Sequence, residues 1–185
     1  FRSGKVTIIG KDVLTLTDDK KAKVPAPNVG ELSAAINAAV TSLSVGSGEG
    51  AAYSASGTLR IGSEVMTFTR STDTFTVVRG TNNTTAASHS QNDLVQECYV
   101  QSATNVRDVI EDLLVNYANI PTKYIPTADW DTEETDWMSG YDVNTVISKP
   151  IGVNKVISSL SESFGVDLFW HEINQEIVLN ALKPP

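Results

Sequence analysis

The composition of the chain changes twice along its length, and this change constrains the fold more than any other feature. Residues 42–98 are rich in Thr, Ser, Gly and Asn and contain short alternating apolar runs, whereas both flanks contain helical patterns. Short strands at this spacing are typical of a small barrel or sandwich. We therefore expect an α+β fold. In it, residues 1–41 and 99–185 form a mixed helix/strand host domain, and residues 42–98 form a small all-β domain inserted into the host.

Two segments after the β-rich region have helical periodicity. Residues 106–114 and 153–164 carry apolar side chains at the three- and four-residue spacing of an amphipathic helix. Thr104 is placed to be the N-cap of the first helix. Pro150 precedes the second helix and Gly165 follows it, and these residue types are preferred near helix starts and ends.

The last part of the chain has the pattern of a hairpin. Residues 166–170 and 176–179 alternate on either side of a short polar stretch, which predicts two antiparallel strands. The apolar faces of the two helices and of this hairpin should form the core of the host domain. The residues expected in this core include Val109, Leu113, Val156, Leu160, Phe169 and Trp170.

The first forty residues give weaker signals. Residues 5–9 alternate and are β-branched, which predicts a strand. Residues 12–16 fit either a second strand or a short helix begun by Asp12. Residues 30–40 are rich in Ala and predict a short helix. Because the chain begins without Met and ends in two prolines, we expect it to be a segment of a longer polypeptide.

The charge balance bears on the choice of partners. The net charge is -8 and the pI is about 4.7, so a nucleic acid would be repelled unless a local basic patch outweighed the total. The three lysines within residues 20–23 adjoin Asp18 and Asp19, which is typical of a solvated turn. No apolar run approaches the roughly 20 residues of a membrane-spanning helix. We therefore expect neither nucleic-acid contact nor membrane insertion.

Residues that could perform chemistry are few. Cys98 is the single cysteine, so no internal disulfide can form, and its strand-like surroundings predict a buried thiol. His89 lies in a Ser/Ala-rich loop and His171 at a turn, and neither has the clustered neighbours of a metal site, which favours solvated or capping roles. Nucleophile-elbow, Walker and dinucleotide-binding motifs are absent. We expect no catalytic residue, no cofactor and no metal.

An acidic stretch at residues 129–137 is the strongest exception. It holds five carboxylates and two tryptophans, which could bind calcium or flank a glycosidic bond. Trp130, Trp137 and Tyr141 could together form a surface on which a sugar stacks. The structural interpretation is favoured, because Trp130 and Trp137 would share one face of a helix and the acidic residues would form its wet side. Carbohydrate-binding and hydrolase functions remain as alternatives.

Two stretches of the β-rich region resemble a module of tailed-bacteriophage structural proteins. They are residues 61–69 (IGSEVMTFT) and residues 76–90 (TVVRGTNNTTAASHS). The flanks, at residues 109–130 and 152–179, resemble the helix and strand pieces of tail-tip or baseplate hub proteins. The sequence departs from the module at Asn83, where the module usually has Gly.

The resemblance implies a structural component of a phage or prophage tail tip. Such a protein would contact other tail-tip or baseplate proteins, or copies of itself, in a ring around the tail axis. It would be assembled in the bacterial cytoplasm and located in the virion. The resemblance implies no catalytic residues. The alternative is a carbohydrate-binding or host-adhesion module of a tail protein, which would bind a glycan of the host surface.

Overall fold

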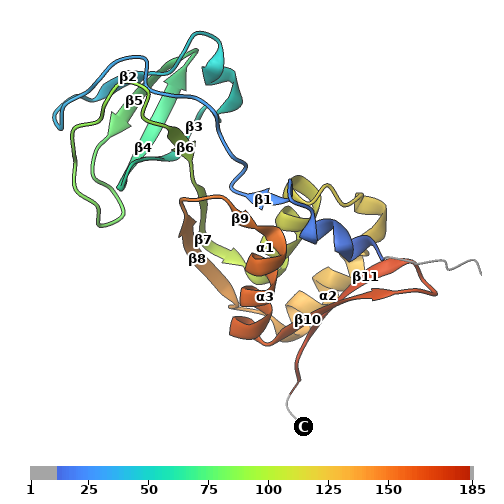
Figure 1. Ribbon diagram of the computed structural model, residues 1–185. Helices are drawn as coiled ribbons and strands as arrows, with labels where there is room; N and C mark the ends of the chain where they lie inside the picture. Colours follow the sequence, from blue (N-terminus) through green and yellow to red (C-terminus); the bar gives the residue numbers. More distant parts are fainter. Residues whose placement is uncertain (1–11, 184–185) are drawn as a thin grey trace, which may run out of the picture.

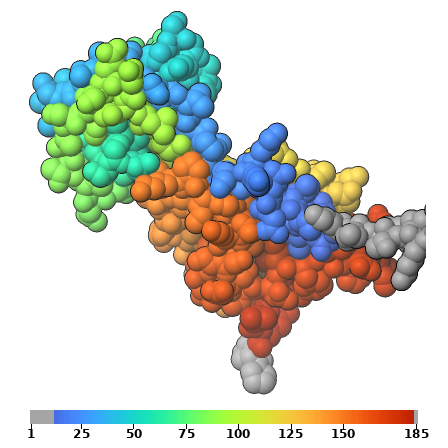
Figure 2. Space-filling model, in the orientation of Figure 1, coloured from blue at the N-terminus to red at the C-terminus, as the bar shows by residue number. Residues whose placement is uncertain are grey.

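Two separate hydrophobic clusters organise the computed structural model, which describes residues 12–183. One cluster takes its buried residues from 32–95, and the other takes them from 22–24 and 99–181. Figure 1 shows the two parts as lobes joined by two crossings of the chain, and Figure 2 shows a waist between them. We call residues 28–97 the sheet lobe and residues 12–24 and 99–183 the mixed lobe.

The sheet lobe is built on one curled antiparallel sheet, as its alternating apolar runs predict. Its strand order is β2-β5-β4-β3-β6, and a short 3-10 helix η2 (Glu49–Ala52) follows β2. The apolar side chains that three of its strands add to the buried cluster lie at alternate positions: Leu59 and Ile61 of β3, Met66 and Phe68 of β4, and Phe75 and Val77 of β5. The strands are β2 (Ser42–Ser44), β3 (Ser56–Ile61), β4 (Glu64–Ser71), β5 (Thr74–Val78) and β6 (Val95–Glu97).

Residues 30–40 close this sheet, and the short helix expected there is wrong. Leu32 bridges to Val45 beside β2, and Glu31 bridges to Leu94 beside β6, so the segment links the two edges of the sheet. Gly30 allows the close approach, because a Cβ there would lie 2.5 Å from the Tyr53 hydroxyl. Backbone hydrogen bonds to the sheet edges outweigh the helical preference of Ala. Leu32 and Ile36 therefore pack with the sheet, although both lie before residue 42.

The mixed lobe packs three helices against three small two-stranded antiparallel sheets. The pairs are β1–β9, β7–β8 and β10–β11. Its strands are β1 (Lys23–Val24), β7 (Tyr99–Asn105), β8 (Asp142–Ile147), β9 (Ile151–Gly152), β10 (Val166–His171) and β11 (Glu176–Ala181). Its helices are α1 (Val106–Asp112), α2 (Thr127–Trp137) and α3 (Val153–Phe164), with shorter turns η1 (Val13–Asp18), η3 (Leu113–Tyr117, a π-helix) and η4 (Thr122–Tyr124).

The helices and the hairpin expected in this lobe are confirmed. Gly165 ends α3 in the left-handed conformation, with φ 63°. The N-cap expected at Thr104 is wrong, because Asn105 takes that position and its side chain accepts a hydrogen bond from the Arg107 amide. Of residues 12–16, for which the sequence fits either a strand or a helix, residues 13–16 belong to the 3-10 turn η1 and Asp12 is its N-cap. The strand expected at residues 5–9 lies outside the described residues.

Most of the expected core residues are where the periodicity placed them. Val109, Leu113 and Leu160 are buried, and Val156 and Trp170 pack partly buried against the same cluster. Phe169 is the exception, since 38% of it is exposed. Neighbouring residues of a strand face opposite sides, so Phe169 turns outward where Trp170 turns inward. No helix among residues 12–183 is both long and apolar enough to cross a lipid bilayer.

Candidate functional site

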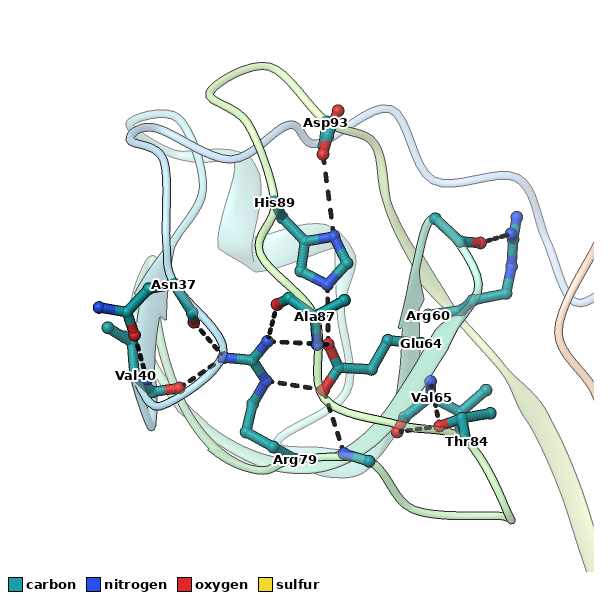
Figure 3. A network of polar contacts seen from close by, with 12 residues as sticks. Asn37, Val40, Arg60, Glu64, Val65, Arg79, Thr84, Ala87, His89 and Asp93 are labelled. Carbon is teal, nitrogen blue, oxygen red and sulfur yellow. Dashed lines mark hydrogen bonds and ion pairs between the residues drawn. The ribbon is translucent and has the colours of Figure 1, made fainter.

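The most developed polar site is a buried carboxylate, Glu64, at the start of β4. Its side chain has no exposed surface. Arg79, which follows β5, binds it with two parallel hydrogen bonds: Nε donates to Oε1 at 2.7 Å and Nη2 to Oε2 at 2.8 Å. Figure 3 shows this pair at the centre of a network that joins three segments of the sheet lobe. The bidentate arrangement is the strongest geometry available to an arginine and a carboxylate.

Three further donors fill the remaining positions around Glu64. The Gly80 amide donates to Oε1 at 3.0 Å, and the Ala87 amide donates to Oε2 at 3.0 Å. His89 Nε2 donates to Oε2 at 2.8 Å. The carboxylate thus accepts five hydrogen bonds, which exceeds the number of its lone pairs. We call Glu64, Arg79 and His89, with the backbone groups that bind them, the Glu64 network.

Arg79 is as fully engaged as Glu64. Its Nη1 donates to the carbonyls of Asn37 and Val40 at 2.9 and 2.8 Å, and its Nη2 also donates to the Ala87 carbonyl at 2.6 Å. All five N–H groups of the guanidinium therefore have partners. The network attaches the loop that follows β5, and the segment that leads into β2, to the body of the sheet.

The protonation of Glu64 follows from these contacts. Burial of the carboxyl would raise its pKa, but the hydrogen bonds from Arg79, Ala87, His89 and Gly80 favour the ionised form and lower the pKa to about 2. A carboxylate this acidic, with every lone pair occupied, is a poor proton acceptor for a reaction. The arrangement is suited to holding the fold together.

The lowered pKa of Glu64 makes the stability of the sheet lobe depend on pH. The unfolded carboxyl titrates near 4.5 and the folded one near 2. The unfolded state therefore binds the proton first, so the stabilisation is complete above about pH 5 and is lost as the pH falls towards 2. A shift of this size corresponds to about 3 kcal/mol. Urea denaturation at pH 7, 4 and 3 should show the loss for the wild type and little of it for Glu64→Gln.

His89 was expected in a solvated or capping role, and the structure corrects this. The residue is buried, with 7% exposed, and its ring lies between Glu64 and Asp93, whose Oδ2 is 3.8 Å from Nδ1. Glu64, which accepts the hydrogen bond, lies 25 residues away in sequence, so the local composition of the loop could not reveal it. His171 does lie at a turn, where its Nδ1 accepts a hydrogen bond from the Asn174 amide at 3.2 Å.

The backbone conformation at Asn83 explains how asparagine can stand where the resembling module usually has glycine. Asn82 and Asn83 both have positive φ, at 52° and 59°, and the Thr84 amide donates to the Thr81 carbonyl across them. Glycine suits this left-handed region best, and asparagine is the side-chain-bearing residue that enters it most readily. An asparagine can therefore occupy a position at which a glycine would be favoured.

The acidic stretch lies on α2, and two of its carboxylates, those of Asp131 and Glu134, lie near Arg107 of α1. Arg107 is buried, and its Nη2 binds Asp131 of α2 at 2.5 Å. Its Nη1 binds Asp108 and Glu111 of its own helix, and Glu134 lies 3.9 Å from Nε. Burial and the neighbouring Asp108 carboxylate raise the pKa of Glu134. The stretch therefore joins two helices through a shared cation.

The three aromatic residues proposed for sugar stacking do not form one exposed surface. Trp130 is only 1% exposed, and its Nε1 donates to the Ile177 carbonyl at 2.9 Å, so it cannot stack on a ligand. Trp137 is 47% exposed, with the Lys183 ammonium 4.7 Å from its ring centre. Tyr141 is half-buried, with its ring 5.9 Å from that of Phe164. Both tryptophans lie on the same face of α2, but Trp130 is in the core and Trp137 is near the edge of the core.

Trp130→Phe tests the role of the indole nitrogen. The substitution keeps an aromatic ring in the core but leaves the Ile177 carbonyl without its donor, so we expect a loss of about 1–3 kcal/mol in the free energy of unfolding. Trp137→Phe, at an exposed position of the same helix, is the matched control and should change it by less than about 0.5 kcal/mol. Urea denaturation followed by far-UV circular dichroism measures both. Equal losses in the two variants would contradict this role.

Comparison with known proteins adds no further constraint. No protein-family model and no curated protein matches the chain. Within residues 12–183, no group of three or more His, Cys, Asp or Glu side chains is placed to hold a metal ion. Cys98 is buried, as expected, and its burial raises the pKa of the thiol to about 11.

Proposed function

We propose that this chain is a structural component of a phage tail tip or baseplate hub. In this proposal the mixed lobe is a hub-like host domain, the sheet lobe is the inserted β module, and the protein acts through lateral contacts in a ring around the tail axis. Its partners are other tail-tip proteins or copies of itself, and its location is the virion. No catalytic residue is assigned.

One observation carries the proposal. The two stretches that resemble the phage module contribute Glu64, Arg79 and His89, and these three side chains meet in one buried network. Residues that are far apart in the resembling stretches therefore act together, at the point where the loop after β5 is fixed to the sheet. This arrangement supports the proposal that the sheet lobe is the β module, because the residues of the resembling stretches serve to hold its fold together.

The chemistry of the described residues supports a role in protein contact. The buried carboxylate of Glu64 has no lone pair left for a reaction, and Asp131 of the acidic stretch binds Arg107. Glu133, also on α2, accepts from the Ala181 amide at 2.9 Å and lies 3.3 Å from Lys183. These groups hold elements of the fold together, which favours a structural role over the hydrolase alternative.

A cryo-electron-microscopy map of the tail particle that contains this sequence tests the proposal. We expect density for the mixed lobe in the wall of a ring, in contact with neighbouring subunits on two sides. A position at the periphery, with no contact to another subunit, would overturn it. In that case the adhesion alternative would take its place, and Trp137→Ala should then abolish binding on a glycan array.

A further inference from the structure

The tip of the β10–β11 hairpin presents an unusual apolar side chain. Ile173 is 90% exposed, the highest value among the large apolar residues of the described chain. Phe169 on β10 adds a second partly exposed apolar side chain, and the acidic residue Glu172 directly precedes Ile173 in the turn. Isolated exposed apolar residues are common, so the exposure of Ile173 indicates a contact only if a complementary surface is also present.

The turn that carries Ile173 is held in shape by side-chain contacts. The Asn174 amide donates to His171 Nδ1 at 3.2 Å, and the Asn174 side chain donates to Glu176 at 2.8 Å. The sheet behind the turn is supported by α2, because Trp130 binds the Ile177 carbonyl and Glu133 binds the Ala181 amide. A projection held in this way loses little conformational entropy when it binds.

A groove of about 250 Å³ on the mixed lobe has the matching properties. Its apolar lining comes from β8, β9 and α3: Val143, Ile147, Ile151, Val156 and Leu160. Lys155 lines the same groove, and no carboxylate does. The groove borders β8, whose backbone makes no hydrogen bond in the described part of the chain except to β7. An edge strand of this kind is a template for a further strand.

The hairpin and the groove lie on different sides of the mixed lobe. Figure 1 shows β7 and β8 at the left of this lobe and the β10–β11 hairpin extending to the right. A hairpin that points away from its own groove can reach the groove of another molecule only. Two different complementary surfaces on one chain produce head-to-tail contacts, which close into rings or continue as filaments.

We propose that the β10–β11 hairpin of one copy inserts its tip into the β8–α3 groove of the next copy. Ile173 enters the apolar groove, Glu172 approaches Lys155, and the hairpin lies along the unpaired edge of β8. This inference rests on the proposed function and names the contact that would form the ring. The occupant is a second copy because the hairpin supplies an apolar side chain that matches the apolar lining and a negative charge that complements Lys155.

Sedimentation equilibrium of the 185-residue chain tests the contact directly. We expect concentration-dependent self-association, which Ile173→Ser weakens by at least about tenfold. Val29→Ser is the matched control, because Val29 is also β-branched and 76% exposed but lies in neither surface. A chain that stays monomeric throughout, or equal association of the two variants, would overturn the inference.

Charge reversal tests the pairing of the two surfaces. Lys155→Glu and Glu172→Lys should each weaken association about tenfold, and the double variant should restore it. Mixing Lys155→Glu, which keeps an intact hairpin, with Ile173→Ser, which keeps an intact groove, should give 1:1 complexes that grow no further. Absence of these complexes and of the rescue would overturn the contact. The map of the tail particle is independent of these results, so a ring formed through other surfaces would leave the proposed function standing.

Discussion

Glu64→Gln is expected to lower the free energy of unfolding of the sheet lobe by about 3–5 kcal/mol. The substitution keeps the size of the side chain but removes its charge, which leaves the Arg79 guanidinium buried without a counterion. The new amide group would also face donors, because Arg79, Ala87 and His89 all direct N–H groups at the same oxygen. Removing one partner of a buried pair is costly for this reason, even where the intact pair adds little net stability.

The position of the tryptophans allows this loss to be assigned to one lobe. Trp130, Trp137 and Trp170 all lie in the mixed lobe, so tryptophan emission follows that lobe alone. Far-UV circular dichroism follows both. We expect Glu64→Gln to shift the dichroism transition in urea and to change the tryptophan transition much less. Glu31→Gln, at an exposed position, is the control. A loss below about 1 kcal/mol would show that the network does not stabilise the lobe.

The same comparison tests whether the two lobes fold as separate domains. The composition predicts a boundary at residue 42, whereas Leu32 already belongs to the cluster under the sheet. The lobes share few contacts, one of which is the hydrogen bond from Arg60 Nε to the Ser148 carbonyl at 2.7 Å. Two transitions that move independently in the variants would support separate domains.

Periodicity predicted those parts of the fold that local sequence controls. The strands after residue 42, the two amphipathic helices and the final hairpin all follow from apolar spacing and from turn residues such as Gly165. Residues 30–40 could not be predicted in this way, because their extended shape depends on partners at Val45 and Leu94. Ala-rich composition describes only the local preference, which long-range pairing overrides.

The candidate site was less predictable than the fold. His89 looks like a loop residue until Glu64 is placed beside it, and no local pattern connects the two. One signal was present: Glu64 is a charged residue directly before the apolar pair Val65 and Met66, and such a residue needs a partner if it is buried. For Trp130 and Trp137 the local pattern was informative, but the burial of each ring was not predictable from it. Their spacing correctly placed them on one helix, but spacing alone does not determine how deep each ring lies.

Leu113→Ala is the second substitution for which we expect a large effect, in the mixed lobe. Leu113 has no exposed surface and lies where α1 passes into the π-helix η3, within the main cluster. Truncation removes buried methyl groups and leaves a cavity that the surrounding helices can fill only in part. We therefore expect a loss of about 2–5 kcal/mol in the free energy of unfolding.

Tryptophan emission during urea denaturation measures this loss in the lobe concerned. Leu182→Ala is the matched control, since the same atoms are removed from a side chain that is 68% exposed, and it should change stability by less than about 0.5 kcal/mol. Leu160→Ala, at a position 9% exposed, should also lie in the range of about 2–5 kcal/mol, towards its lower end. A loss below about 0.5 kcal/mol for Leu113→Ala would mean that this helix face does not form the core. Because Leu113 belongs to the cluster of the mixed lobe, the sheet lobe should keep its stability while the tryptophan transition moves, which is the reverse of the Glu64→Gln result.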